Sequence, residues 1–347
     1  MSTPPNRNST HYPTYLPYTE HTDVSDSSIP ESFSWQDQIQ LCPVGNQGSC
    51  GDCWAFSTAG MLTDRLTVAT GKYQGAIAVQ SISGCAFAAV RDRLSSMTNT
   101  TISSKVGTCS TGGFIAAGCI FAENYGVPLD TCVPYKNGDS CPTTSKCTPL
   151  YSFTKGSTTT VTTGPDGAAE SLLLDIEYKP GALSQDTIDA NVRNMQKEIM
   201  KNGPLAIGYM CMQSMMGSAW KDQTSEEDVY QVSDNDTVDG GHAVVIVGWG
   251  VTPTNKTPYW LIRNSWGSTW NSPLNGYWRH LRGSNNSGIE SSAIAAQASA
   301  APVTQAYTGG SLPSNSNTTW PTWKIALLVS AIILVLLIVA FVFRLVL

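Results

Sequence analysis

A cysteine that follows a glycine-rich turn and precedes a helical pattern is the residue in this sequence best suited to covalent chemistry. In the segment NQGSCGDCWAFS, Cys53 stands directly before residues 54–70, where apolar side chains recur at helical spacing until Gly71. A thiol at a helix N-terminus feels the positive end of the helix dipole, which lowers its pKa and favours the thiolate. The pattern therefore predicts that Cys53 is a nucleophile.

The same segment also contains Cys50, which forms a Cys-x-x-Cys pair with Cys53. Such pairs serve redox and metal chemistry, and this remains the alternative interpretation of the motif. A metal site would need further ligands at finger or ribbon spacing, and the sequence contains neither a second Cys-x-x-Cys nor a paired histidine. We therefore expect no metal and no cofactor.

A base for this nucleophile has to come from four histidines, of which His11 and His21 lie in a polar N-terminal stretch. His242 follows Gly240-Gly241 and begins the apolar run HAVVIVGW, whereas its competitor His280 lies in YWRHL without a glycine approach. Asn264 stands between the apolar run YWLIR and Trp266, where its amide could orient an imidazole. The expected pair is His242 as base and Asn264 as its orienting partner.

Four segments together resemble the papain-type (peptidase C1) cysteine proteases. QGSCGDCWAFS resembles the nucleophile segment, with Asp52 where that signature has Ser or Ala. GGHA followed by VGWG resembles the histidine segment, RNSWG the asparagine segment, and TGG after Cys109 the Cys-Asn-Gly-Gly loop with its Asn replaced. The order of the segments is that of the family, over about 265 residues.

This resemblance implies a catalytic set made of Cys53, His242, Asn264 and Gln47. Cys53 and His242 would form a thiolate and imidazolium pair, and Asn264 would hold the imidazole. The backbone N–H of Cys53 and the Gln47 side chain would form the oxyanion hole. For substrate binding, the resemblance implies backbone contacts at three glycines and two side-chain positions: Gly51, Gly112, Gly113, Trp266 and Ser292.

The pattern is closest to cathepsin B. Residues 132–135, 201–204, 258–261 and 288–291 resemble its segments, and His242 and Asn264 lie 189 and 211 residues after Cys53, against about 130 to 150 in papain-like chains. The insertion of cathepsin B carries an adjacent histidine pair that gives exopeptidase action; this sequence has none, so we expect an endopeptidase. Ser292 stands where cathepsin B has an acidic residue, which implies a preference for apolar side chains in that pocket.

The family pattern also implies a Cys50–Cys109 disulfide, with Cys132, Cys141 and Cys147 stapling the insertion in an unknown connectivity. With ten cysteines and one used as nucleophile, at least one more stays unpaired within the chain. So many cysteines favour an oxidising compartment.

The elements that must position these residues are predicted to form an α+β, two-lobed papain-like fold. A helical lobe begins with the helix of Cys53, and a β-barrel-like lobe carries His242 and Asn264. A second helix is expected over residues 185–201, ended by Asn-Gly-Pro, and strands over 242–249 and 259–263.

The chain is expected to divide into a disordered polar arm (1–28), the protease domain (29–297), a flexible linker (298–323) and a transmembrane helix (324–344). The last contains IALLVSAIILVLLIVAFVF, nineteen residues without a charge, between Lys324 and Arg344. We therefore expect a single-pass membrane protein, whose orientation the flanking charges do not decide. A lone C-terminal span favours the cytosol for the domain, whereas the cysteines favour an oxidising lumen or the exterior.

Composition argues against nucleic acid as a partner, whereas the resemblance implies protein or peptide substrates and the apolar C-terminal run implies a membrane. A net charge of -6 and a pI near 5.2 leave no basic surface for nucleic acid. Two alternatives remain beside hydrolysis: a catalytically silent module that captures peptides, and acyl transfer to an amine through the same residues.

Overall fold

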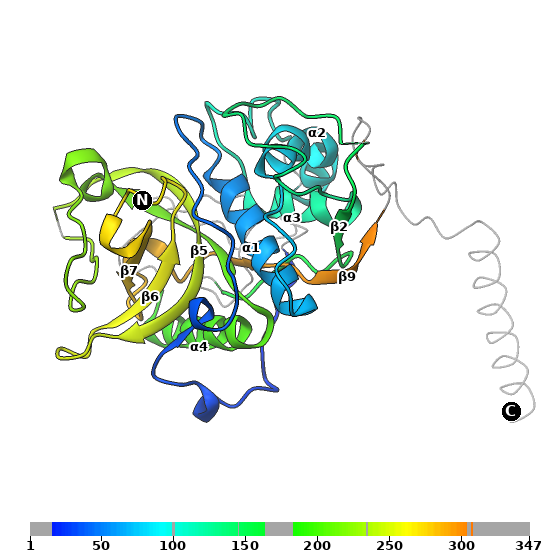
Figure 1. Cartoon of the computed structure of the whole chain (residues 1–347). Helices are drawn as coiled ribbons and strands as arrows, with labels where there is room; N and C mark the ends of the chain where they lie inside the picture. The colour runs from blue at the N-terminus through cyan, green and yellow to red at the C-terminus, as the bar shows by residue number, and fades with distance from the viewer. Residues whose placement is uncertain are drawn as a thin grey trace, which may run out of the picture. The chain divides into compact units, whose positions relative to one another are not determined.

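The computed structural model describes residues 16–98, 101–144, 146–163, 183–233, 235–303 and 307. The helices are α1 (Cys53–Thr70), α2 (Val79–Thr98), α3 (Ile115–Asn124) and α4 (Gln185–Asn202), with 3-10 turns η1 (Asp26–Ser28), η2 (Trp35–Asp37), η3 (Gln213–Met215), η4 (Gly217–Ala219), η5 (Ser272–Leu274) and η6 (Asn286–Gly288). The strands are β1 (Phe33–Ser34), β2 (Leu150–Phe153), β3 (Thr159–Thr160), β4 (Leu205–Met212), β5 (Val238–Val251), β6 (Pro258–Arg263), β7 (Tyr277–Leu281), β8 (Ala293–Ala295) and β9 (Ala298–Val303). Figure 1 shows α2 and α3 in one lobe with β2 and β9, and β5, β6 and β7 in the other with α4, and α1 lies between the two lobes.

Helix α1 is the central element of the fold. It packs against α2 and α3 on one side and against β5 on the other, and it is buried along most of its length. Gly60 permits this close packing, because a Cβ atom there would lie 2.5 Å from the Arg263 guanidinium of β6. The helix ends at Gly71, which adopts the left-handed conformation that glycine tolerates best. The helix predicted over 54–70 is thus confirmed.

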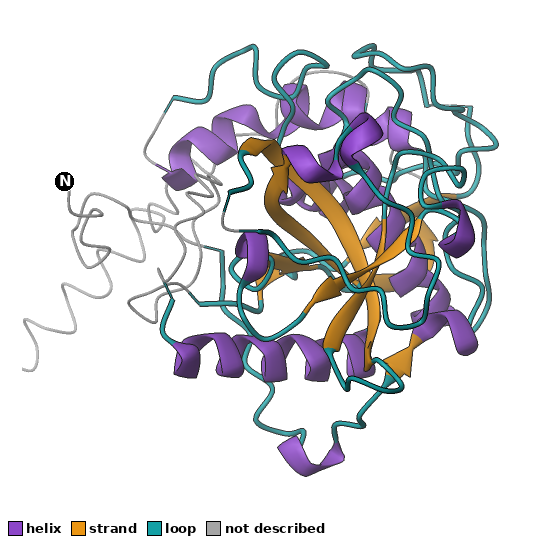
Figure 2. Cartoon of the chain, turned by 90° about the vertical axis from the view of Figure 1, so that its left-hand side faces the viewer, coloured by secondary structure: helices purple, strands orange, loops and turns teal. Residues whose placement is uncertain are grey.

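The sheet lobe is built on β5, the longest strand. The strand order is β3-β8-β4-β5-β6-β7, all antiparallel neighbours, and β1 also pairs with β5. Figure 2 shows these strands crossing the middle of the molecule with α4 running beside them. Met195 and Ile199 of α4 pack into the core with Ile207 and Trp260 of the sheet. The strands predicted over 242–249 and 259–263 therefore lie side by side as β5 and β6.

Helix α4 begins and ends at the signals that the sequence supplies. The Ser184 hydroxyl accepts a hydrogen bond from the Thr187 N–H at the N-terminus, and Gly203 caps the C-terminus before Pro204. The observed bounds, Gln185–Asn202, match the predicted 185–201 to within one residue.

Two features of the sheet and the N-terminal arm correct the expectations. The described strands form an open sheet in which the short edge strands β3 and β7 do not pair with each other, so the barrel-like lobe is not a closed barrel. Residues 16–28, expected to be disordered, lie against the sheet lobe: the Thr160 N–H donates to the Pro17 carbonyl (2.9 Å), and the Lys201 ammonium lies 2.6 Å from the Asp23 carboxylate. Several side chains of this arm, among them His21 and Asp23, pair with α4, although most of its residues are exposed.

The start of the expected linker also belongs to the fold. Residues 298–303 form β9 and pair antiparallel with β2, and Tyr307 packs edge-on against Phe121 and Tyr125. Small residues such as Ala and Ser gave these positions the composition of a linker, although their backbone completes a two-stranded sheet.

The transmembrane helix predicted over 324–344 lies outside the described residues, as does most of the linker before it. In the part of the chain that the structure describes, no helix combines the length and apolar character needed to cross a membrane.

Candidate active site

Cys53 is the first residue of α1, and a disulfide fixes the turn before it. Cys50 is bonded to Cys109, as the family pattern implied, and the Gly51 N–H donates to the Cys109 carbonyl at 2.9 Å. Cys50 is therefore unavailable to Cys53, and the alternative of a Cys50–Cys53 redox or metal pair is wrong. Cys53 itself is free and partly exposed.

The structure shows which of the remaining cysteines form disulfides and which are free. Cys132 pairs with Cys147 within the insertion, and Cys141 pairs with Cys85 of α2, so one of the expected staples reaches back to α2. Cys42, Cys119 and Cys211 are free in addition to Cys53.

His242 and Asn264 meet across β5 and the end of β6. The His242 Nε2 atom lies 2.9 Å from the Asn264 Oδ1 atom, which also accepts the Ser265 N–H at 2.8 Å. The Trp266 indole stacks on the imidazole with ring centroids 4.7 Å apart. Asn264 thus holds the imidazole, as the resemblance implied, and Trp266 covers the contact between them.

The Cys53 thiol lies beside the strand that carries His242. Helix α1 packs against β5, and the N–H of Ala243, the residue after His242, acts to lower the pKa of the Cys53 thiol. His280, the competing histidine, is fully buried elsewhere in the sheet, with Nδ1 accepting from the Trp278 indole N–H and Nε2 facing the Asn286 carbonyl. The structure therefore favours His242 as the partner of Cys53.

Burial sets the charge of both groups when each titrates alone. It raises the pKa of the Cys53 thiol to about 11, against which the Ala243 and Trp54 N–H groups act in the opposite direction. It also lowers the pKa of His242 to about 4, although the Asn264 hydrogen bond acts to raise it. The helix dipole led us to expect a lowered thiol pKa, and this expectation is wrong for the isolated thiol because loss of solvation outweighs the helix terminus.

Gln47 is tied to the asparagine segment through Ser265. The Gln47 N–H donates to the Ser265 carbonyl (2.8 Å), and the Ser265 hydroxyl donates to Gln47 Oε1 (2.7 Å). The Gln47 side-chain N–H₂ donates to the Cys50 carbonyl at 3.0 Å. This contact holds the amide close to the turn that carries Cys53.

The expected substrate-binding glycines lie around the same turn. A Cβ atom on Gly51 would come within 3.3 Å of the Gly112 backbone nitrogen, and Gly112 adopts a φ of 65°. A Cβ atom on Gly113 would lie 2.7 Å from the Trp54 indole, so packing alone requires glycine at that position. Gly51 and Gly112 thus approach each other where a side chain would not fit.

Ser292 lies in the same sheet at some distance from the nucleophile. It is buried just before β8, and its carbonyl accepts the Gly208 N–H of β4 at 3.0 Å. Gly208 is paired in turn with Ala243 of β5. Two strand spacings, about 10 Å, therefore separate Ser292 from Ala243.

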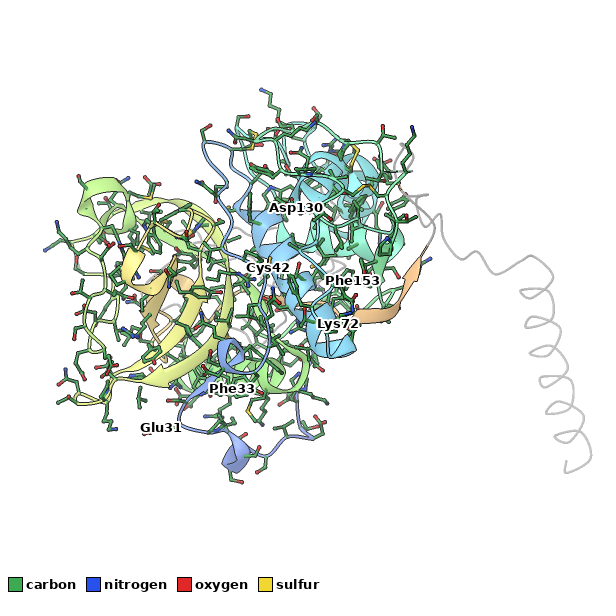
Figure 3. The ribbon with its side chains drawn as sticks, in the orientation of Figure 1. Glu31, Phe33, Cys42, Lys72, Asp130 and Phe153 are labelled. Atoms are coloured by element: carbon green, nitrogen blue, oxygen red, sulfur yellow. A yellow bond between two sulfur atoms is a disulfide. The ribbon has the colours of Figure 1, made fainter. Side chains whose placement is uncertain are left out.

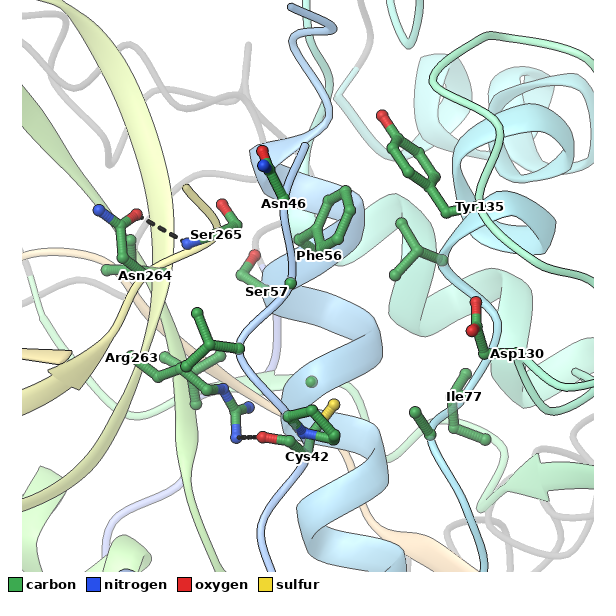
Figure 4. Close-up of a pocket in the computed structure, with 18 of the residues that line it drawn as sticks. Cys42, Asn46, Phe56, Ser57, Ile77, Asp130, Tyr135, Arg263, Asn264 and Ser265 are labelled. Atoms are coloured by element: carbon green, nitrogen blue, oxygen red, sulfur yellow. Dashed lines mark hydrogen bonds between the residues drawn. The ribbon is translucent and has the colours of Figure 1, made fainter. Parts of the chain in front are cut away.

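Sequence reasoning missed a pocket on the side of α1 that faces residues 42–46. Its volume is about 280 Å³, and Figure 4 shows Cys42, Phe56, Ser57, Asp130 and Tyr135 around it, with Arg263, Asn264 and Ser265 on the strand side. Cys42 and Asp130 both lie near α1 in the whole-molecule view (Figure 3). Neither Cys53 nor His242 lines this pocket, but Ala243 and Asn264 do, so the pocket adjoins the candidate site without including the nucleophile.

Sequence reasoning also missed Tyr135 and Ser265 as neighbours of the site. Tyr135 lies 83 residues from Asp52 in the sequence, and its hydroxyl donates a hydrogen bond to the Asp52 carboxylate. The one available signal was Asp52, the position that departs from the nucleophile signature.

Comparison with known proteins agrees with this geometry. The model of the papain family cysteine protease matches residues 29–297. "Cathepsin B-like CP2" of Giardia intestinalis is 30% identical over 283 residues, covering 79% of this chain and 75% of that protein. "Cathepsin B-like cysteine proteinase 5" of Caenorhabditis elegans is 30% identical over 303 residues, covering 79% and 76%.

Solved structures show the same fold. Procathepsin B S9 from Trypanosoma congolense superposes with a TM-score of 0.58 at 23% identity, covering 85% of each chain. Procathepsin L 3 of Tenebrio molitor larval midgut gives a TM-score of 0.53 at 21% identity, covering 82% of this chain and 74% of that one. With a family match over most of the folded residues, the chain belongs to the papain family of cysteine proteases, and it is a hydrolase of the cysteine-peptidase type.

Proposed function

We propose that the protein is an endopeptidase that cleaves peptide bonds through an acyl-enzyme on Cys53. The observation that carries this proposal is the His242–Asn264 hydrogen bond beneath Trp266, with His242 on β5, the strand that packs against the helix of Cys53. Each group is neutral alone at pH 7, but transfer of the thiol proton to His242 gives a thiolate and imidazolium pair whose mutual attraction offsets part of the loss of solvation.

The reaction then follows from the placement of these groups. The thiolate attacks the peptide carbonyl carbon, and the electron pair of the C=O double bond moves to oxygen. The Cys53 N–H and the Gln47 amide would stabilise that oxyanion. His242 gives its proton to the leaving amine, and a thioester remains on Cys53. Water attacks the thioester while His242 takes its proton, which releases the acid and restores the thiol.

Two sequence features support the finer specificity. The chain has no adjacent pair of histidines, so nothing of that kind would bind a substrate's terminal carboxylate, and internal bonds are the proposed targets. Ser292 carries no charge, which favours an apolar side chain two residues before the cut. Gly112 would offer its backbone to the extended substrate, as in strand addition.

Hydrolysis of internally quenched peptides by the purified full chain tests this proposal. We expect cleavage at internal bonds, read by mass spectrometry of the products, and loss of at least about 10³-fold in kcat for Cys53→Ala and His242→Ala. Release of dipeptides from the C-terminus instead would contradict the endopeptidase assignment. Retained peptide binding with no turnover by the wild-type chain would favour a silent binding module.

Acyl transfer to an amine is the second outcome that the same residues allow. Its test is to add a primary amine to the assay: hydrolysis predicts free carboxyl termini as the main product, whereas transfer predicts amides.

We also propose that the domain is tethered to a membrane and faces an oxidising compartment. The uncharged residues 325–343 support the tether, and the three disulfides support the compartment. Protease protection of the full chain in sealed vesicles, together with glycan occupancy at Asn255, which begins the sequon Asn-Lys-Thr, tests both.

A further inference from the structure

Asp52 is a buried carboxyl group directly before the nucleophile. Its residue has no exposed surface, and it stands at the N-cap of α1. An N-cap carboxylate ordinarily accepts hydrogen bonds from the first helical N–H groups, yet the Asp52 side chain makes no cap hydrogen bond. The carboxyl group therefore forms its hydrogen bond with a residue outside the helix.

That contact is the Tyr135 hydroxyl, which lies between two acceptors. The hydroxyl oxygen is 2.9 Å from Asp52 Oδ2 and 3.1 Å from the Gln47 carbonyl oxygen. Because a tyrosine has one hydroxyl proton, it can serve only one of these acceptors fully at a time. The ring is held against Phe56, with centroids 4.8 Å apart at 77°, as Figure 4 shows beside the pocket.

Hydrogen bonds connect Gln47 to His242, the proposed base. Gln47 is bonded twice to Ser265, whose N–H donates to Asn264 Oδ1, the acceptor that faces His242. A continuous series of hydrogen bonds thus runs from Asp52 to the imidazole.

The groups facing Asp52 come from three elements. α1 contributes Cys53, α2 contributes the Ser83 hydroxyl, and the loop after α3 contributes Tyr135 and the exposed Asp139. Burial raises the pKa of the Asp52 carboxyl, the Tyr135 hydrogen bond and the nearby Ser83 hydroxyl oppose this, and the Asp139 charge adds to it. The Asp52 charge in turn raises the pKa of the Cys53 thiol.

We propose that Asp52 and Tyr135 form a proton-linked positioning pair for Cys53 and Gln47, an inference that rests on the proposed function. With Asp52 ionised, the Tyr135 proton is donated to the carboxylate, and a negative charge stands beside the thiol. When Asp52 takes up one proton from solvent, its O–H donates to the Tyr135 oxygen, and the Tyr135 proton is donated to the Gln47 carbonyl. The oxyanion turn then gains a hydrogen bond, and the charge opposing the thiolate is gone, so mild acid favours the active arrangement.

Asp52→Asn tests the charge, because the new amide keeps the shape, cannot ionise and can donate to Tyr135. Iodoacetamide, an uncharged reagent, is applied to the full chain over a range of pH, and alkylation is followed at the Cys53 peptide by mass spectrometry. We expect the variant to be alkylated at Cys53 roughly 10-fold faster than wild type at neutral pH, and the two profiles to meet in mild acid, where wild-type Asp52 is itself protonated. The matched control is Asp139→Asn, which removes a neighbouring but exposed charge and should move the profile by less than about a third as much.

Tyr135→Phe tests the positioning, because it removes the hydroxyl and keeps the ring on Phe56. We expect kcat for an internally quenched peptide to fall about 10-fold with KM unchanged, since Tyr135 acts through Gln47 rather than on substrate. Asp52→Ser, which restores a residue of the family signature, is the second variant if Asp52→Asn folds poorly, with the thermal midpoint measured for each.

Two results would overturn the proposal that Asp52 and Tyr135 act as a pair. One is an unchanged alkylation profile of Cys53 in both Asp52 variants, and the other is a Tyr135→Phe variant whose thermal midpoint changes while its kcat does not. A wild-type chain that hydrolyses no peptide overturns the proposed function instead, and the alkylation profile still decides whether Asp52 controls the thiol.

Discussion

The Nε2 atom of His242 lies 2.9 Å from Oδ1 of Asn264, and the Trp266 ring covers the pair at a centroid distance of 4.7 Å. One ring nitrogen of His242 is therefore occupied by a neutral acceptor, and in the proposed mechanism Nδ1 is the atom that exchanges a proton with Cys53. The strength of the hydrogen bond to Asn264 therefore determines how much of the time the His242 imidazole has the orientation that the mechanism requires.

Removing the Asn264 amide should consequently slow catalysis without weakening substrate binding. For Asn264→Ala we expect kcat to fall about 10- to 100-fold with little change in KM, because the imidazole loses its orientation. Steady-state kinetics on one fluorogenic peptide measures both. Asn124→Ala, whose amide donates to the Ile120 carbonyl within α3, is the matched control. Equal kcat values for Asn264→Ala and wild type would show that the contact does not position the base.

The reactivity of Cys53 should depend on His242 in a way that pH reveals. Burial raises the pKa of the isolated thiol to about 11, so in His242→Ala we expect alkylation of Cys53 to increase with pH up to that region. In the wild-type chain, proton transfer to His242 should make Cys53 react near pH 7 about 100-fold faster than in the variant.

Cys42 provides an internal reference for that experiment. It is a free thiol whose pKa burial also raises to about 11, and its own profile should be the same in both proteins. A Cys53 profile that does not change in His242→Ala would mean that the two groups do not exchange a proton.

The buried carboxylate of Glu198 should make stability depend on acid. Burial alone would raise its pKa, but the Arg65 guanidinium at 2.7 Å and the hydrogen bonds from His21 and Asn202 lower it to about 2. Because the folded pKa lies below the unfolded value, this stabilisation is present above about pH 4.5 and is lost as pH falls toward 2, by about 3 kcal/mol in all.

Urea unfolding of Glu198→Gln between pH 2 and 7 measures this term. We expect the variant to be less stable at pH 7 and to show a shallower fall in free energy of unfolding below pH 4.5. Glu226→Gln, an exposed carboxylate on the β4–β5 connection, should retain the wild-type slope. The same slope in Glu198→Gln would assign the acid sensitivity to other groups.

Ser292 should decide the response to a basic side chain two residues before the cut. The wild-type chain is expected to prefer Leu or Phe to Arg at that substrate position, and Ser292→Glu should raise kcat/KM for Arg about 10-fold by adding an opposite charge. Ser291→Glu, one residue away on a partly exposed side chain, is the matched control. An Arg preference in the wild-type chain would contradict the assignment of this pocket.

The elements with strong local signals could be predicted from the sequence. Helices α1 and α4 end at glycines, so their bounds follow from neighbouring residues. Strands β5 and β6 are apolar runs between turn formers, but β5 extends beyond the predicted 242–249 to Val238–Val251. Strand β9 could not be found in this way, because Ala and Ser fit a linker as well as a strand and its pairing with β2 depends on residues about 150 positions away.

The same distinction between local signals and contacts with distant residues applies to the candidate site. Residue types and their order marked Cys53, His242 and Asn264, whereas the direction of the thiol pKa depends on burial by both lobes and was predicted wrongly. The contact of Asp52 with Tyr135 joins loops 83 residues apart, and a single side chain leaves no periodic pattern from which to infer it.

Active-site labelling tests the central claim most directly. The full chain is treated with an epoxysuccinyl peptide, a thiol-directed epoxide, and the label is located by mass spectrometry while peptide hydrolysis is followed in the same sample. We predict one label per chain, on Cys53 rather than Cys42, Cys119 or Cys211, with hydrolysis lost in proportion to labelling and no labelling in Cys53→Ser. Hydrolysis that persists in Cys53→Ser, or complete labelling of Cys53 that leaves hydrolysis intact, would contradict it.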